Sequence, residues 1–141
     1  PTSAAKQIAT LYLARLGLQD AANLFPHQIS AGMQQRVALG RALAIDPDYL
    51  LLDKPFKSLD VGLRLSLVRL LLNEWQRRPR PLLFVTHDIT EAALAGQRIL
   101  VVGSRPLTII EELKPGRPPT VRRPGDADVL ESEARLYSLL A

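Results

Sequence analysis

The sequence predicts an α/β fold in which parallel strands are joined by crossover helices. Two short apolar runs, YLLLD at residues 49–53 and PLLFVTHD at 81–88, are typical of strands buried on both faces of a sheet. The leucine-rich segment between them, residues 60–78, has helical periodicity. Strand, helix and strand in this order predict a right-handed parallel crossover, which would bring Asp53 and His87 to the same edge of the sheet.

Three helices are predicted in the first half of the chain. Residues 3–16 form the first, Ser30 is the candidate N-cap of the second, which ends before Asp46 and Pro47, and Asp60 is the candidate N-cap of the third. The stripes predicted to face the core are, in order, Ile8, Leu11, Tyr12 and Leu16; Met33, Val37, Gly40 and Ala44; and Leu63, Leu67, Leu70, Leu71 and Trp75.

The sequence of the second half of the chain predicts shorter helices and strands. We expect a short helix at residues 91–95, strands at 98–103 and 107–113, and a connector rich in proline and arginine at 114–125. Helical periodicity returns at residues 126–141. The stripe of this last helix comprises Val129, Glu133, Leu136 and Leu140.

Composition limits the classes of function open to the chain. Its 141 residues suffice for one domain, and no apolar run approaches the roughly 20 residues of a membrane helix. Without cysteine the chain has no disulfide and no cysteine-based metal site, which fits a reducing cytoplasm. Only two histidines are present, which argues against a metal site built on histidine.

The chain is basic, with a net charge of +4. Arginines gather in two clusters that could attract nucleic acid or an anionic lipid surface, although solvated basic faces are commoner. The chain has no recognised nucleic-acid motif and no aromatic platform for bases, so we expect no specific nucleic-acid partner. The clusters comprise Arg77, Arg78 and Arg80, and Arg117, Arg122 and Arg123.

The stretch ISAGMQQR, residues 29–36, places a serine, a glycine and two glutamines where the second helix begins. A helix N-terminus presents unpaired backbone N–H groups and the positive end of the helix dipole. Ser30, Ala31 and Gly32 therefore form a candidate anion-binding edge.

Several motifs together resemble a known family. The run ISAGMQQRVALGRALAIDPDYLLLDKPFKSLD, followed by LLFVTHD and EA, resembles the C-terminal half of an ATP-binding-cassette (ABC) ATPase. A signature motif, a Walker B strand, a D-loop and an H-loop histidine occur in the family's order between about residues 11 and 102. The stretches PHQISAGMQQRVALGRAL and FVTHDITEA are most similar to importers of the nitrate, sulfonate and taurine type.

The resemblance implies part of a P-loop NTPase fold that lacks the P-loop half. Residues 1–113 would be the C-terminal portion of the ATPase domain. Within this portion, residues 1–45 would hold part of the helical subdomain and the signature helix, and residues 46–113 would run from Walker B to the strands after the H-loop. Residues 114–125 would connect it to a C-terminal helix at 126–141.

The resemblance also implies roles for individual residues. Asp53 would orient Mg²⁺, and His87 would contact the γ-phosphate of ATP and help position the attacking water. The signature residues would bind nucleotide held by the opposite subunit, which requires a head-to-tail dimer; they are Ser30, Ala31, Gly32, Met33 and Gln34. The D-loop residues, which would communicate across that dimer, are Ser58, Leu59 and Asp60.

The most informative departure from the family is Lys54, which stands where the family has a catalytic glutamate. An ammonium group cannot accept a proton from the attacking water, and it would pair with Asp53 or with phosphate instead. We therefore expect severely impaired hydrolysis with nucleotide affinity retained. Ala31 replaces the usual first glycine of the signature, and Lys57 stands where a small residue is common.

A second departure is the lack of a P-loop motif, since no glycine in the chain is followed by lysine. We expect a longer chain that carries the P-loop, and an unpaired apolar edge on the strand of Asp53 without it. ATP and Mg²⁺ are expected only with that missing half or a partner. The implied partners are a second ATP-binding subunit and membrane-spanning permease subunits, and the implied location is the cytoplasmic face of the cell membrane.

Two hypotheses remain open on the sequence. In the first, the chain is a portion of an importer ATPase subunit that couples ATP binding and hydrolysis to solute transport. In the second, it is a catalytically silent half-domain that lends its signature helix to another subunit, or a gene remnant. Lys54 is the residue that favours the second hypothesis.

Overall fold

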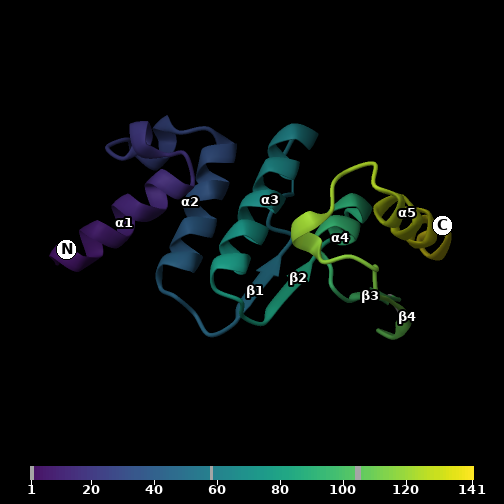
Figure 1. Cartoon of the computed structure of the whole chain (residues 1–141). Coiled ribbons are helices and arrows are strands. Elements are labelled where there is room, and N and C mark those ends of the chain that lie inside the picture. The colour runs from purple at the N-terminus through teal and green to yellow at the C-terminus, as the bar shows by residue number, and fades with distance from the viewer. Residues whose placement is uncertain (1, 58, 104–105) are drawn as a thin grey trace.

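The computed structural model describes residues 2–57, 59–103 and 106–141. The termini lie at opposite ends of the molecule, with α1 and α2 near the N-terminus and α4 and α5 near the C-terminus (Figure 1). The helices and strands in this part of the chain are α1 (Ser3–Arg15), α2 (Ala31–Ala44), β1 (Leu50–Asp53), α3 (Val61–Arg77), β2 (Leu82–Val85), α4 (Ile89–Ala95), β3 (Ile99–Val102), β4 (Ile109–Leu113) and α5 (Ala127–Leu140).

The first sheet confirms the predicted parallel pair. β1 and β2 pair in parallel, with Leu50 opposite Leu82 and Asp53 opposite Val85, and α3 connects them. The Lys54 N–H donates to the Val85 carbonyl at 2.8 Å, which extends the pairing by one residue. The segments that follow β1 and β2 therefore leave the sheet at the same edge, as the α/β prediction requires.

Burial of these strands on both faces was wrong for the described part of the chain. Leu50 is buried, but Leu51 is 65% exposed and Leu83 is 58% exposed. Side chains alternate between the two faces of a strand, so one face packs on the core and the other is open. Within the described residues the sheet has only two strands, so β1 has one unpaired edge, as we expected.

The core lies around α3 rather than along the stripes predicted for α1 and α2. No residue of α1 is buried, and Met33, Val37 and Ala44 of α2 are only partly buried. Helix α2 instead buries Gly32, Leu39, Gly40 and Leu43. Helix α3 buries Leu67, Val68, Leu71, Leu72 and Glu74.

Two glycines allow α2 to pack closely on its neighbours. A Cβ atom on Gly32 would overlap the Leu63 side chain of α3. A Cβ atom on Gly40 would overlap the Leu16 side chain, which follows α1. The predicted stripes are thus confirmed at Leu16 and Gly40, which are buried, and wrong at Ile8 and Leu11, which are exposed. The neighbours of α2, rather than periodicity alone, decide which of its sides is buried.

The C-terminal part adds an antiparallel pair and a helix. β3 and β4 pair antiparallel, and α5 packs on α4. Helix α5 buries Val129, Ser132 and Leu136, and Glu133 is half-buried, so the predicted stripe is wrong only at Leu140. The expected connector at 114–125 contains a short 3₁₀ helix, Pro119–Val121. Among the described residues, no helix has the length and apolar character needed to cross a bilayer.

Most of the clustered arginines are engaged within the molecule. Arg78 and Arg80 both pair with Asp46, and Arg117 pairs with two carboxylates, Asp126 and Asp128. Arg122, in the second cluster, is 6% exposed and contacts backbone carbonyls. Intramolecular partners therefore occupy most of the arginines of the two clusters.

Candidate functional site

The N-terminus of α2 has the capped geometry that the sequence predicted. Ser30 is extended, and its Oγ accepts a hydrogen bond from the Met33 N–H at 3.2 Å. Ser30 and Ala31 are exposed, whereas Gly32 is buried. The N–H groups of the first helical positions, Ala31 and Gly32, have no intrahelical acceptor and leave the positive end of the helix dipole open.

Gln34 holds the segment that leads into α2. Its side-chain amide donates to the Pro26 carbonyl at 2.9 Å and to the Ile29 carbonyl at 3.4 Å. Gln28 acts similarly, because its Oε1 accepts from the Phe25 N–H at 2.8 Å. The sequence-predicted nucleotide contact of Gln34 stays a prediction, and the structure adds a local role for this side chain.

Lys54 lies directly beyond β1 with a backbone φ of +45°. Side chains with a Cβ seldom adopt this left-handed region, and such strain gathers at functional sites. The Lys54 N–H is bound to the Val85 carbonyl, and its own carbonyl accepts from the Lys57 N–H at 3.2 Å. A tight turn at the end of β1 therefore sets the directions of both lysines.

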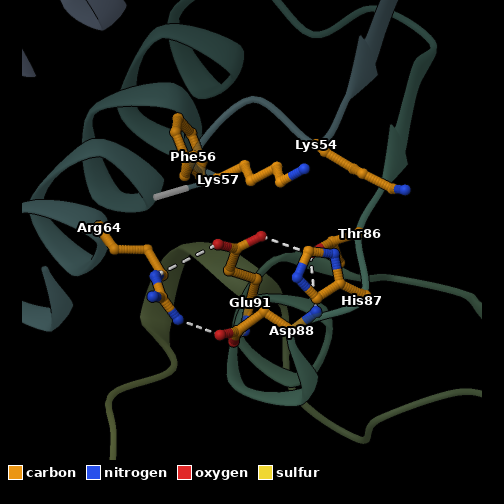
Figure 2. Close-up of a pocket in the computed structure, with 8 residues that line it drawn as sticks. All are labelled: Lys54, Phe56, Lys57, Arg64, Thr86, His87, Asp88 and Glu91. Carbon is orange, nitrogen blue, oxygen red and sulfur yellow. Dashed lines mark hydrogen bonds and ion pairs between the residues drawn. The ribbon is translucent and has the colours of Figure 1, made fainter. Parts of the chain in front are cut away.

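The ends of β1 and β2 open onto a shared pocket (Figure 2). Lys54 and Lys57 come from the turn after β1, and His87 comes from the segment after β2. Among the described residues, neither lysine has a carboxylate within ion-pair distance. The residues that line the pocket are Lys54, Phe56, Lys57, Arg64, Thr86, His87, Asp88 and Glu91.

A network of buried and half-buried polar groups forms one wall of this pocket. Glu91 is 4% exposed, and the Thr86 hydroxyl donates to its Oε2 at 2.6 Å. Arg64 pairs with Asp88 and lies 3.6 Å from Glu91 Oε1 through its Nε. Burial raises the pKa of Glu91, against the Thr86 hydrogen bond and the Arg64 charge, which lower it.

The segment before α3 confirms one predicted cap. Asp60 Oδ1 accepts from the Leu63 N–H at 2.9 Å. Leu59 is buried, and its carbonyl accepts from Arg64 Nη2 at 3.0 Å. The third predicted D-loop residue, Ser58, lies outside the described residues.

Asp53 is suited to only part of a magnesium site. It is exposed at the end of β1, opposite Val85, while His87 follows two residues after Val85. Within the described ranges, no group of three or more histidines and acidic residues is placed to hold a metal. One carboxylate fits Mg²⁺ that takes its other ligands from phosphate and water, which is common for this ion.

Sequence reasoning assigned no role to several residues of the pocket, among them Arg64 and Glu91. A signal for Glu91 was present, because DITE at 88–91 has the spacing of an N-cap residue and its N3 partner. Asp88 does cap α4, since its Oδ1 accepts from the Glu91 N–H at 2.9 Å. Arg64 had no such local signal, because its partners lie on other segments.

Comparison with known proteins shows what this arrangement is similar to. A family described as ABC transporter matches residues 3–57. A sulfonates import ATP-binding protein of Pseudomonas syringae pv. tomato is 48% identical over 101 residues, which cover 72% of this chain and 44% of the relative. The chain is a homologue of ABC transporter ATP-binding proteins. The predicted family resemblance is thus confirmed.

Other ABC relatives agree with this assignment. A nitrate import ATP-binding protein of Synechocystis sp. is 40% identical over 120 residues, which cover 85% of this chain and 43% of the relative. A taurine import ATP-binding protein of Rhizobium johnstonii is 42% identical over 106 residues, covering 74% of this chain and 40% of the relative. The chain therefore spans less than half the length of these curated relatives.

The fold also matches a solved ABC structure. A transporter assigned to the metal-chelate ABC type, in an inward-facing conformation, superposes with a TM-score of 0.71 at 25% identity. The match covers 79% of this chain and 45% of that chain. The predicted fold class, part of an ABC ATPase with parallel strands and a crossover helix, is confirmed.

Proposed function

We propose that this chain works as part of the ATP-binding subunit of an ABC importer, peripheral on the cytoplasmic face of the membrane. The observation that carries the proposal is the parallel pairing of β1 and β2, which brings Lys54 and His87 to one pocket in the family's motif order. Its proposed partners are a second ATP-binding subunit and membrane-spanning permease subunits. The two ATP-binding subunits would be arranged head to tail.

In this proposal the N-terminus of α2 serves nucleotide held by the partner. The N–H groups of Ala31 and Gly32, the Ser30 hydroxyl and the helix dipole would face the γ-phosphate, since an exposed helix N-terminus favours an anion. Met33 and Gln34 would complete this edge. Leu59 and Asp60, with Ser58, would lie near the contact between the two subunits.

At the carboxyl ends of β1 and β2, Asp53 and His87 would have the roles that the matching residues have in the family. His87 would contact the γ-phosphate, and Asp53 would orient Mg²⁺ together with water and phosphate oxygens. Lys54 replaces the proton acceptor by an ammonium group, so hydrolysis at this site would be slow. Lys54 and Lys57 would instead attract phosphate charge.

The trans role of α2 can be tested on the chain itself. We expect the labelled chain to bind the full-length Synechocystis nitrate import protein in the presence of ATP and Mg²⁺, as measured by analytical ultracentrifugation. Ala31→Glu should abolish this binding, because a carboxylate would then oppose the phosphate. The matched control is Ser3→Glu at the first position of α1. A wild-type chain that does not associate contradicts the proposal.

A second candidate function is a catalytically silent partner, which Lys54 favours. ATP hydrolysis separates the two functions when it is measured on a longer chain that also carries the P-loop half. Hydrolysis that rises with Lys54→Glu supports an ATPase site disabled by one substitution. Hydrolysis that stays unchanged supports a silent partner that contributes only its signature helix.

A further inference from the structure

Arg64 joins two segments that flank the pocket. From the first full turn of α3, its Nη2 donates to the Leu59 carbonyl at 3.0 Å. Its Nη1 pairs with the Asp88 carboxylate, in the segment between β2 and α4. One guanidinium therefore contacts both the D-loop segment before α3 and the segment that carries His87. Figure 2 shows its pairing with the carboxylates beside His87.

The segment around His87 is closed by three side chains. The Asp88 N–H donates to Thr86 Oγ1 at 3.0 Å, and the Thr86 hydroxyl donates to Glu91 Oε2 at 2.6 Å. The Glu91 N–H donates in turn to Asp88 Oδ1 at 2.9 Å. These bonds form a ring that fixes the backbone on both sides of His87, and Arg64 braces the ring through Asp88.

The His87 side chain depends on this backbone. Within the part of the chain that the structure describes, its imidazole takes part in no ion pair, although it lines the pocket. With no ion pair to hold the ring among these residues, its direction follows from the backbone of residues 86–88. Arg64 contacts both this segment, through Asp88, and Leu59.

We infer that Arg64 is a positioning residue that couples the D-loop segment to His87. The coupling needs a rigid planar fork, because a guanidinium donates in several fixed directions and an ammonium is a single point charge. The proposed function is needed only for the consequence at ATP. In that case a partner subunit that displaces Leu59 would also shift His87. The coupling itself is a property of this chain.

The test uses NMR on the chain alone, without nucleotide. The two histidines separate cleanly, because His27 lies in the segment before α2, stacked on Phe25, and serves as an internal reference. In Arg64→Gln and Arg64→Lys we expect the Leu59 and Asp88 amide signals to shift together and the ring-proton signals of the His87 imidazole to shift with them. The ring-proton signals of His27 should stay as in the wild type. Exchange of the Glu91 amide should accelerate about tenfold or more as the Asp88 cap loosens.

The matched control is Arg69→Gln, an exposed arginine on the same helix. It should leave His87, Leu59 and Asp88 as in the wild type. Arg64→Gln spectra that equal those of the control would overturn the inference. So would full rescue by Arg64→Lys, since positive charge alone would then suffice. Because no nucleotide is used, either failure is independent of whether the chain acts on ATP.

Discussion

The two ends of α4 are each held by an arginine, but in different ways. At its start, Arg64 pairs with the carboxylates of Asp88 and Glu91, and a quarter of its side chain is exposed. At its end, Arg122 is almost fully buried and donates to the Ala93 and Gly96 carbonyls at 2.9 and 2.7 Å. The same residue type thus serves the site at one end and the helix terminus at the other.

The difference follows from the backbone groups that lack a hydrogen-bond partner at each end of a helix: N–H groups at the start and carbonyl groups at the end. The last carbonyls of α4 have no intrahelical donor, and Arg122 supplies it from the connector. Burial lowers the pKa of Arg122, and the negative charge of Asp128 acts against this shift. Arg64 acts on side chains next to His87, where some exposure leaves room for adjustment.

The largest effect should come from Arg122→Met. The variant leaves the Ala93 and Gly96 carbonyls without their donor, and we expect a loss of about 2–4 kcal/mol in the free energy of unfolding. Urea denaturation followed by circular dichroism measures this loss. Arg123→Met, the exposed neighbour, should change stability by less than about 0.5 kcal/mol. Equal effects of the two variants would break the comparison.

Arg64→Gln should cost less stability, about 1–2 kcal/mol, because Asp88, the carboxylate that it pairs with, is partly exposed and can reach water once the guanidinium is gone. The same urea titration applies. The comparison predicts opposite rankings for two readouts: Arg122→Met lowers stability more, and Arg64→Gln disturbs His87 more. A larger His87 change in the Arg122 variant would contradict it.

Glu91 should make the free energy of unfolding depend on pH, which tests the start of α4 separately from its end. Its folded pKa is raised above the ordinary 4.5 by burial, so the folded state holds the proton more tightly than the unfolded state. The contribution of Glu91 to stability is then greatest below about pH 4.5 and falls as pH rises through the raised pKa. Glu91→Gln lacks this titration.

Urea melts of wild type and Glu91→Gln at several pH values measure the effect. The free energy of unfolding of the wild type relative to the variant should fall as the pH rises from about 4.5 through the raised pKa of Glu91. Taking the difference removes the pH dependence that comes from the carboxylates that both proteins have. A constant difference would mean that Arg64 offsets the burial of Glu91 completely.

The smallest effect should come from the contact of α4 with α5. The Thr90 hydroxyl donates to Glu133 Oε1 at 2.7 Å. Thr90→Val should cost about 0.5–1.5 kcal/mol, since the partner carboxylate can turn to solvent. Differential scanning calorimetry measures the shift in Tm. A loss as large as that of Arg122→Met would place the main anchor of α4 on α5.

Local patterns in the sequence predicted much of the fold. Ser30 and Asp60 cap their helices as expected, because a capping side chain acts on an N–H three residues away. The parallel pairing of β1 and β2 also followed from the order of strand, helix and strand. Inner faces were less predictable: Met33 and Val37 were expected in the core, yet Gly32 and Leu39 are buried.

The sequence by itself determined the ABC motifs, the helix starts, the strand order and the anomaly at Lys54, because each depends on neighbouring residues or on residue type. Only the tertiary structure decided that Arg64 contacts Leu59 and Asp88 and that Arg122 lies buried at the end of α4. Those contacts join residues from 5 to 29 positions apart. Side chains on separate segments meet only when the packed elements bring them together, and no local pattern encodes that distance.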